Sequence, residues 1–396
     1  MTALQNLKIA DFSWVGAGPR ATKDLADNGA TVIKIESRKR LDLGRRSPPF
    51  VGDHKDPDGS AFFAQTNTSK LSVTINLMTD EGIELAKRLI AWADVVVENF
   101  GPGFMERIGL GYEELKNIKP DIILASVSVA GKTGPMSGFR GYGNSAAAHS
   151  GHADMTGWPG TEPHMPPLAY GDVIAPMFAT VAILAALEER QRTGLGQHLD
   201  VSQIEPMVHV IADLLAQPEP VEKLGNADPD MAPHGVYATQ NDDEWIAVAV
   251  ETDEQWLSFC DALNEPGLDD YRDLNSGQRL QQAAKLDQLL VELCRGRDRD
   301  ELIAVLEKAA VPVAQVLDGE TLFKNDELNR FGHFVELDHP VLGRSKMPAP
   351  PMIFSATPCE LTRSPCLGEH NHQVFVELLG LPPADYNALV EAEIIL

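Results

Sequence analysis

Residues 7–37 read LKIADFSWVGAGPRATKDLADNGATVIKIES, and this stretch decides the fold class. Two short runs rich in β-branched and apolar residues, LKIADFS (7–13) and TVIKIES (31–37), flank a helical pattern over about 19–28. A strand, a helix and a second strand in this order are typical of a βαβ unit with parallel strands. The sequence therefore predicts an α/β protein.

The same alternation continues to about residue 200. The segments that follow are a helix at about 80–93, the run DVVVENF (94–100), a helix at about 112–118 and the run DIILASVSV (121–129). Asp80 is expected to cap its helix, and Gly29 and Gly194 are expected to end helices. We expect a parallel sheet with helices on both faces.

The composition changes after Ala216. The segment QPEPVEKLGNADPDMAPHG (217–235) replaces apolar periodicity with proline, glycine and acids, which indicates a linker. Strands and helices follow, up to ELIAVLEKAAVPVAQVLD (301–318), and they predict a small α+β domain.

Charge and composition restrict the class of protein. The 396 residues include 33 Lys and Arg against 58 Asp and Glu, a net charge of −25, which opposes binding to nucleic acid or to anionic membranes. The first residues lack the pattern of a signal peptide, and no uninterrupted apolar segment is long enough to span a bilayer, so we expect a cytoplasmic protein. The four cysteines lack C-x-x-C spacing and are expected to be free thiols.

Three local patterns have both a functional and a structural interpretation. Gly16-x-Gly18-x-x-Ala21, with Glu36 ending the next strand, approaches a dinucleotide-binding pattern, although Pro19 and Arg20 do not suit its tight turn. His149 and His152 have ligand spacing but no third ligand nearby, so no metal site is expected. The basic segment 34–46 is either a solvated loop or a local site for an anion.

Two glycine-rich segments are similarly open. The segment NFGPGFMERIGLGYEEL (99–115) has a single basic residue, Arg107, and is most simply a structural turn. The segment AGKTGPMSGFRGYGNSAAAHSG (130–151) carries Lys132, Arg140 and Tyr142, and it is either a flexible loop or an active-site lid.

Asp172 stands alone in front of a long apolar run that has no other charge until Glu188. Aspartate is a preferred residue for capping a helix, so a helix over about 173–192 would account for it. A carboxylate at the positive end of a buried helix also stays ionised, and Gly171 gives access to the backbone there. Capping and nucleophilic attack are compatible, and the residues alone leave both open.

Six segments, taken in order, resemble family III CoA-transferases, the group of formyl-CoA transferase and carnitine CoA-transferase. They are residues 7–37, NTSKLSVTINL (67–77), ADVVVENFGPGFMERIGLGYEEL (93–115), PDIILASVSVAGKTGP (120–135), ALEERQRTGLGQHLDVS (186–202) and LGEHNHQVFVELLGL (367–381). The resemblance covers nearly the whole chain. It implies exchange of CoA between an acyl-CoA thioester and a free carboxylic acid, with CoA thioester as substrate and no tightly bound cofactor.

The resemblance also assigns residues. Asp172 falls on the family's nucleophile, which forms a mixed anhydride and then an aspartyl-CoA thioester. The residues implied to line the CoA site are Val15, Gly16, Arg38, Arg107, Arg140 and Tyr142. Arg140 stands where formyl-CoA transferase has a lysine.

The fold implied by the resemblance is a Rossmann-like large domain built from both chain ends. Residues 1–216 and 326–396 would form it, with the linker and the small domain at 217–325. The resemblance further implies an interlocked homodimer, and a paralogous partner subunit is the other possibility. A non-catalytic subunit of a hetero-oligomer would not need Asp172.

The related α-methylacyl-CoA racemases are the main alternative. They carry a histidine ahead of their aspartate, whereas RGYGNS (140–145) has none, which favours transfer. The glycine-rich loop of formyl-CoA transferase also has no match in MAPHGVYATQNDDEW (231–245), which indicates a larger acyl group than formate or oxalate. We expect the acceptor acid to contact residues 149–164 and the segment near His234 and Tyr237. A nicotinamide-dependent dehydrogenase is a weaker alternative.

Overall fold

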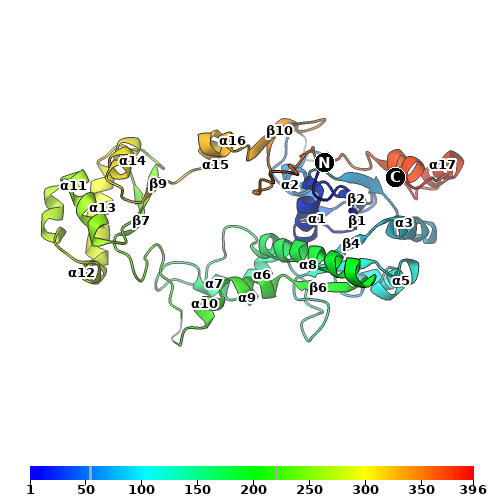
Figure 1. The fold of residues 1–396 in the computed structure, drawn as a ribbon, viewed down its shortest axis with the longest axis horizontal. Coiled ribbons are helices and arrows are strands. Elements are labelled where there is room, and N and C mark those ends of the chain that lie inside the picture. Colours follow the sequence, from blue (N-terminus) through cyan, green and yellow to red (C-terminus); the bar gives the residue numbers. More distant parts are fainter. Residues whose placement is uncertain (53–55, 219–220) are drawn as a thin grey trace. The chain divides into compact units, whose positions relative to one another are not determined.

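The computed structural model describes residues 1–52, 56–218 and 221–396 (Figure 1). Its internal contacts divide the chain into a larger unit, residues 1–153, 165–219 and 327–396, and a smaller unit, residues 154–164 and 220–326. The predicted linker starts at Gln217, and its residues 219–220 lie outside the described residues.

A six-stranded parallel sheet forms the centre of the larger unit. Its strands are β1 (Lys8–Asp11), β2 (Thr31–Glu36), β3 (Leu71–Thr74), β4 (Val95–Glu98), β5 (Ile123–Ser128) and β6 (His198–Ser202). They lie in the order β3-β2-β1-β4-β5-β6. On the central strand, Ile9 is paired with Val32 of β2 and Val95 of β4.

Helices cover both faces of this sheet, as predicted (Figure 1). The helical elements of the first part of the chain are α1 (Ala17–Asp27), a 3₁₀ turn η1 (Leu43–Arg46), α2 (Ala61–Thr66), α3 (Asp80–Trp92), α4 (Phe104–Arg107), α5 (Tyr112–Ile118), α6 (Gly143–His149), α7 (His152–Met155), α8 (Gly171–Thr193), α9 (Ile204–Val210) and α10 (Ala212–Leu215). Because strand side chains alternate, Ile9 packs with α1 and α8 on one face and Ala10 with α3 and α5 on the other.

The C-terminal residues return to the larger unit. They form α16 (Asp326–Arg330), the antiparallel pair β10 (Phe334–His339) and β11 (Gly343–Pro348), a π-helical segment η3 (Gln373–Leu378) and α17 (Pro383–Glu391). Val374 and Phe375 of η3 are fully buried in the core on the α3 side. The Asn371 side chain also accepts a hydrogen bond from the Thr74 N–H at 2.8 Å.

The smaller unit has its own sheet and core. Its elements are β7 (His234–Ala238), β8 (Trp245–Ala249), α11 (Asp253–Leu263), η2 (Pro266–Tyr271), α12 (Ser276–Gln281), α13 (Ala283–Arg295), α14 (Arg299–Lys308), β9 (Val313–Gln315) and α15 (Gly319–Lys324). The three strands pair antiparallel in chain order. Trp256 of α11 stacks on Phe259 at 5.5 Å and is completely buried.

Helix boundaries agree with the sequence except at two caps. Helix α5 begins and ends as predicted, and α8 ends before Gly194, which is left-handed at φ 73°. Helix α3 is capped by Thr79, whose hydroxyl accepts the Gly82 N–H at 3.1 Å, so the prediction that Asp80 caps it was wrong. Helix α8 begins at Gly171 and has Tyr170 at its cap position, so Asp172 does not cap it.

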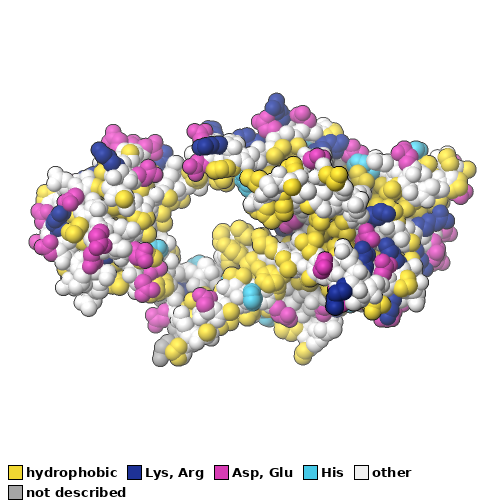
Figure 2. Space-filling model, in the orientation of Figure 1, with side chains coloured by type: hydrophobic (Ala, Val, Ile, Leu, Met, Phe, Trp, Pro, Cys, Tyr) yellow, Lys and Arg dark blue, Asp and Glu magenta, His cyan; other side chains and the backbone are white. Residues whose placement is uncertain are grey.

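Helix α8 is long and apolar enough, by length and composition, to cross a membrane. The prediction that no apolar segment is long enough to span a bilayer was therefore wrong. Helix α8 nevertheless packs on β5, β6 and α1, with Ile183 and Ala186 in the core. Core helices of soluble proteins have this composition, so it is weak evidence for a membrane span. Figure 2 shows further hydrophobic side chains exposed over its N-terminal half.

The described cysteines, Cys260, Cys294, Cys359 and Cys366, are all free thiols, as predicted.

Candidate active site

A pocket of about 640 Å³ lies at the carboxyl ends of the parallel strands in the larger unit. Residues that directly follow or end β1, β2, β4 and β5 line it, among them Phe12, Ser37, Asn99 and Ser128. Ligands of open α/β sheets bind at this edge, because the loops there converge.

The loop between β1 and α1 forms one wall of the pocket in a strained conformation. Asn99 fixes it, since its side chain accepts the Trp14 N–H and donates to the Trp14 carbonyl, both at 2.7 Å. Val15 then adopts φ 63°, which is unusual for a β-branched residue. Its N–H donates to Asp42 Oδ1 at 2.9 Å, and Asp42 itself is completely buried. Backbone strain of this kind often accompanies functional sites.

Asp172 reaches the same pocket from the first turn of α8. Its carboxylate accepts the backbone N–H of Gly143 at 3.2 Å and the Gln203 side-chain amide at 3.1 Å. Neither donor belongs to α8, so the carboxylate is held across three elements and is not used to cap its own helix. An oxygen held by a fixed backbone donor at the positive end of a helix is suited to reaction chemistry.

Gly16 packs directly against Asp172. A β-carbon at position 16 would lie 3.0 Å from Asp172 Cβ and 3.1 Å from its Cγ. The glycine therefore makes room for the carboxylate, rather than for a pyrophosphate as in the dinucleotide-binding pattern. Glu36 is also committed, because its two carboxylate oxygens accept Arg45 at 2.7 and 2.8 Å. These contacts exclude the ribose-binding role that a dehydrogenase would need.

The pKa of the Asp172 carboxyl is raised above its usual value. Burial is the main cause, and the Gly143 N–H, the Arg20 charge and the Gln203 amide offset it in part. Desolvation disfavours the charged form, so an ionised Asp172 is more basic here than in water.

Basic and aromatic side chains form a further part of the pocket wall. Arg40 lies over the Trp14 ring at 5.4 Å and Arg107 over the Phe104 ring at 5.9 Å. Lys39, Arg40, Arg107 and Arg140 all line the pocket. Because the whole chain is strongly acidic, this concentration of positive charge marks the pocket as a site for an anion such as a phosphate.

The structure brings most of the predicted site residues together. Val15, Gly16, Arg107, Arg140, Tyr142 and Asp172 line the pocket. Arg38 is not among the described lining residues, and its guanidinium donates to the Leu367 carbonyl at 3.1 Å. Its chain neighbours Lys39 and Arg40 line the pocket instead.

Sequence reasoning missed the groups that hold Asp172. Gln203 directly follows β6, and a polar residue at the end of a predicted strand is a signal that could have been used. The Gly143 N–H is a backbone group without a side-chain signature, and only the fold places it.

The remaining candidates have structural roles. Lys132 pairs with Glu98 at 3.0 Å and donates to the Phe100 carbonyl, and His149 lies edge-on to Phe139 at 4.8 Å. His152 Nδ1 lies 3.0 Å from Ser150 Oγ. Within the described part of the chain, no group of three or more His, Cys, Asp or Glu side chains is arranged to hold a metal ion.

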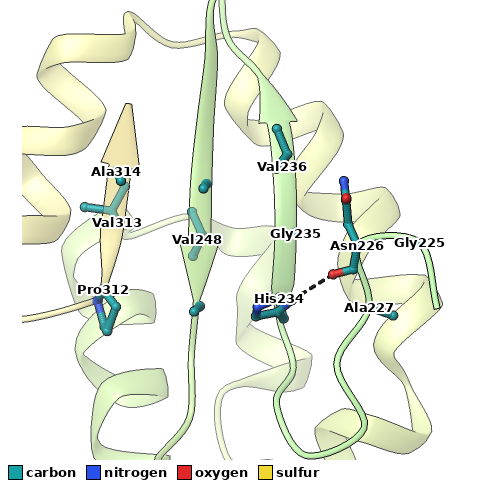
Figure 3. Close-up of a pocket in the computed structure, with 12 residues that line it drawn as sticks. Gly225, Asn226, Ala227, His234, Gly235, Val236, Val248, Pro312, Val313 and Ala314 are labelled. Atoms are coloured by element: carbon teal, nitrogen blue, oxygen red, sulfur yellow. Dashed lines mark hydrogen bonds between the residues drawn. The ribbon is translucent and has the colours of Figure 1, made fainter. Parts of the chain in front are cut away.

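A second pocket, of about 450 Å³, lies on the sheet of the smaller unit (Figure 3). Small residues such as Gly235, Ala247 and Ala314 line it. His234 is the one titratable residue among those drawn, and its Nδ1 lies 2.7 Å from the Asn226 carbonyl. Tyr237 is buried and donates to Asp287 at 2.7 Å. The described residues that line this pocket include no carboxylate, thiol or hydroxyl side chain.

Comparison with known proteins gives matches over nearly the whole chain. A sequence model of CoA-transferase family III matches residues 4–371. A succinate–glutarate CoA-transferase of Agrobacterium fabrum is 34% identical, over 95% of this chain and 95% of that protein. A succinyl-CoA–D-citramalate CoA-transferase of Chloroflexus aurantiacus is 31% identical, over 98% of this chain and 97% of that protein.

A solved structure extends the likeness to the whole fold. The crystal structure of a CAIB/BAIF family protein from Brucella suis is similar with a TM-score of 0.87 and 34% identity, covering 95% of this chain and 99% of that one. The sequence match, the relatives and the fold agree over nearly the full length. The chain belongs to CoA-transferase family III and is a CoA-transferase enzyme.

Proposed function

We propose that this enzyme exchanges CoA between an acyl-CoA thioester and a free carboxylic acid through covalent intermediates on Asp172. The observation that carries the proposal is the Asp172 carboxylate, which is held by Gly143 and Gln203 in the same pocket as four basic side chains.

The first half of the reaction uses Asp172 as a nucleophile. A carboxylate oxygen attacks the thioester carbonyl, the C–S bond breaks, and CoA leaves as a thiolate while a mixed anhydride forms. The thiolate then attacks the aspartyl carbonyl carbon of the anhydride, which releases the first acid and leaves an aspartyl-CoA thioester. The Gly143 N–H donates to an Asp172 oxygen, and negative charge develops on the aspartyl carbonyl oxygen when the thiolate attacks it.

The second half reverses these steps with the acceptor. Its carboxylate attacks the aspartyl-CoA carbonyl and displaces the thiolate, and the thiolate then attacks the acceptor's carbonyl carbon. The products are the new acyl-CoA and a free Asp172 carboxylate. The two carboxylate anions, which repel each other, therefore never react directly, because each reacts with Asp172 in its own half of the reaction.

The basic wall is proposed to bind the CoA phosphates. Arg107 and Arg140 provide planar guanidinium donors, and Tyr142 stands beside them in the pocket lining. Val15 and Gly16 bring the backbone close to the thioester end, next to Asp172. Arg38, which contacts Leu367 in this structure, stays a predicted CoA contact.

The relatives indicate the class of acid. One is named for succinate and glutarate and another for succinyl-CoA and D-citramalate. Succinate, glutarate and D-citramalate are dicarboxylic acids, and succinyl-CoA is the CoA thioester of one. We propose succinyl-CoA as donor and a dicarboxylate as acceptor, which agrees with a larger acyl group than formate.

The proposed assembly is an interlocked homodimer, with a paralogous partner subunit as the alternative. The larger unit would be its Rossmann-like CoA-binding domain, built from both chain ends. An exposed row on α8 supports an interface, because Met177, Val181 and Leu184 are 57%, 66% and 40% exposed at helical spacing. Apolar side chains in a row on one helix face are typical of a surface that a partner covers.

A racemase is the second candidate, and the pocket argues against it. Proton transfer at an α-carbon needs a pair of acid and base groups, most often with a histidine. None of the described residues that line the pocket is a histidine. Solvent deuterium entering the α-carbon of an acyl-CoA without CoA exchange would select the racemase.

The direct test is whether Asp172 carries the acyl group. We expect Asp172→Asn to abolish exchange between succinyl-CoA and a labelled dicarboxylate. We also expect hydroxylamine to trap an acylated enzyme during turnover of the unchanged protein but not of the variant. Glu188→Gln, an exposed acid on the same helix, serves as the matched control and should keep full activity. Full exchange by purified Asp172→Asn would reject the proposal. Activity of the unchanged chain only with a second subunit would support the hetero-oligomer.

A further inference from the structure

Arg20 on α1 has a buried polar group without a partner. Its Nε is completely shielded from solvent and has no hydrogen-bond partner among the described residues. Arg45 of the same unit is completely buried as a residue, and it is paired with Glu36 at 2.7 Å and 2.8 Å. A buried guanidinium donor without an acceptor is costly, so a site of this kind calls for an acceptor that the protein alone does not supply.

The position of Arg20 relates it directly to the reacting carboxylate. Its N–H bonds to the Gly16 carbonyl at 3.0 Å, so Arg20 lies one helical turn after the residue that packs against Asp172. Helices α1 and α8 lie side by side, and Thr180 of α8 donates to the Ala21 carbonyl at 3.3 Å (Figure 1). The charges of Arg20 and Asp172 are close enough to shift each other's pKa.

Arg20 is separate from the four basic side chains that line the larger pocket. Gly16 and Asp172 line that pocket, whereas Arg20 is not among its described lining residues. An acyl group joined to Asp172 must extend away from the leaving thiolate. Arg20 follows Gly16 by one turn of α1, and Gly16 packs against Asp172, so we place its charge at the acyl end of the site rather than with the side chains proposed to bind the CoA phosphates.

We propose that Arg20 binds the second carboxylate of a dicarboxylic substrate and thereby sets the enzyme's preference for dicarboxylic acids. Nε and a terminal nitrogen of a guanidinium match the two oxygens of a carboxylate, and the bound oxygen satisfies the buried Nε. No covalent step is involved, since Arg20 only holds the end of the acid that does not react. This assignment rests on the proposed function of Asp172.

The test compares acids that differ only in the second carboxylate. In Arg20→Gln, we expect kcat/KM to fall by about 10- to 100-fold for glutarate and to stay unchanged for valerate, which has the same chain length. Arg20→Lys keeps the positive charge but lacks the two parallel N–H donors of the guanidinium, and it should restore part of the glutarate activity. Arg88→Gln, an exposed arginine on α3, is the matched control and should behave like the unchanged enzyme.

A second readout separates this role from an effect on folding or on Asp172. Intact-protein mass spectrometry would follow acylation of Asp172 by succinyl-CoA and by butyryl-CoA in a single turnover. Slower acylation by succinyl-CoA alone supports the proposal. An equal fall with both donors means that Arg20 acts on Asp172 or on the fold, and equal rates for all variants mean that it has no role, so both results overturn it. If Asp172 of the unchanged enzyme is never acylated, the proposed function itself fails.

Discussion

Gly16→Ala tests the placement of the nucleophile with the smallest possible change. The added β-carbon would lie 3.0 Å from Asp172 Cβ, against about 3.4 Å or more for an ordinary contact, so the aspartate must move by about 0.4 Å. The bond from the Gly143 N–H to Asp172 is already 3.2 Å long, at the upper end of the normal range. Stretching it to about 3.6 Å would remove it as a hydrogen bond.

The expected effect follows from these distances. Loss of one bond to a charged group, together with a displacement of the reacting oxygen, lowers kcat by about 10- to 100-fold. The assay is CoA exchange from succinyl-CoA to a dicarboxylate, with circular dichroism to confirm the fold. Gly319→Ala is the control, because a β-carbon there meets no atom within 4 Å. An unchanged kcat in Gly16→Ala would refute the argument that Gly16 sets the position of Asp172.

Three further changes test the electrostatics. Asp172→Asn should be more stable than the unchanged protein at neutral pH, because the pKa of Asp172 is raised in the folded state. The folded state of the unchanged protein therefore binds more protons than its unfolded state, and its stability falls as pH rises from the ordinary pKa to the raised one. Urea unfolding at several pH values should show that the advantage of the variant vanishes below that interval. Gln203→Leu removes a donor that lowers the pKa of Asp172, so the acidic limb of the kcat against pH profile should move to higher pH, and an unmoved limb would contradict the assigned hydrogen bond. Lys70→Met should lower the free energy of unfolding, measured in urea, by about 3–5 kcal/mol, because it leaves the buried Asp11 carboxylate without the Lys70 partner at 2.9 Å. The control Lys87→Met, which breaks an exposed pair, should lower it by less than about 1 kcal/mol.

The local parts of the fold were predictable from sequence because they depend on neighbouring residues. Alternation of apolar runs and helical patterns gave the parallel sheet and its covering helices, and α5 was placed to the residue. Cap positions were less accurate, since Thr79 and Asp80 are adjacent and both suit the role.

The environment of Asp172 was less accessible. Residues alone left it between a helix cap and a nucleophile, and its actual donors stand 29 and 31 positions away along the chain. No local pattern connects such positions, because only the sheet brings α6, α8 and the end of β6 together. The same limit applies to the basic segment, where the conformation of the chain after β2 decides which of Arg38, Lys39 and Arg40 face the pocket.

The left-handed conformation of Val15 has a consequence for attempts to make this enzyme more robust. At φ 63° a glycine has less steric strain than a β-branched residue, so selection for heat resistance alone would favour Val15→Gly. That change would also release a wall of the pocket that Asn99 and Asp42 hold in place. Screens for durable variants should therefore score turnover together with melting temperature, because at this position the two criteria reward opposite residues.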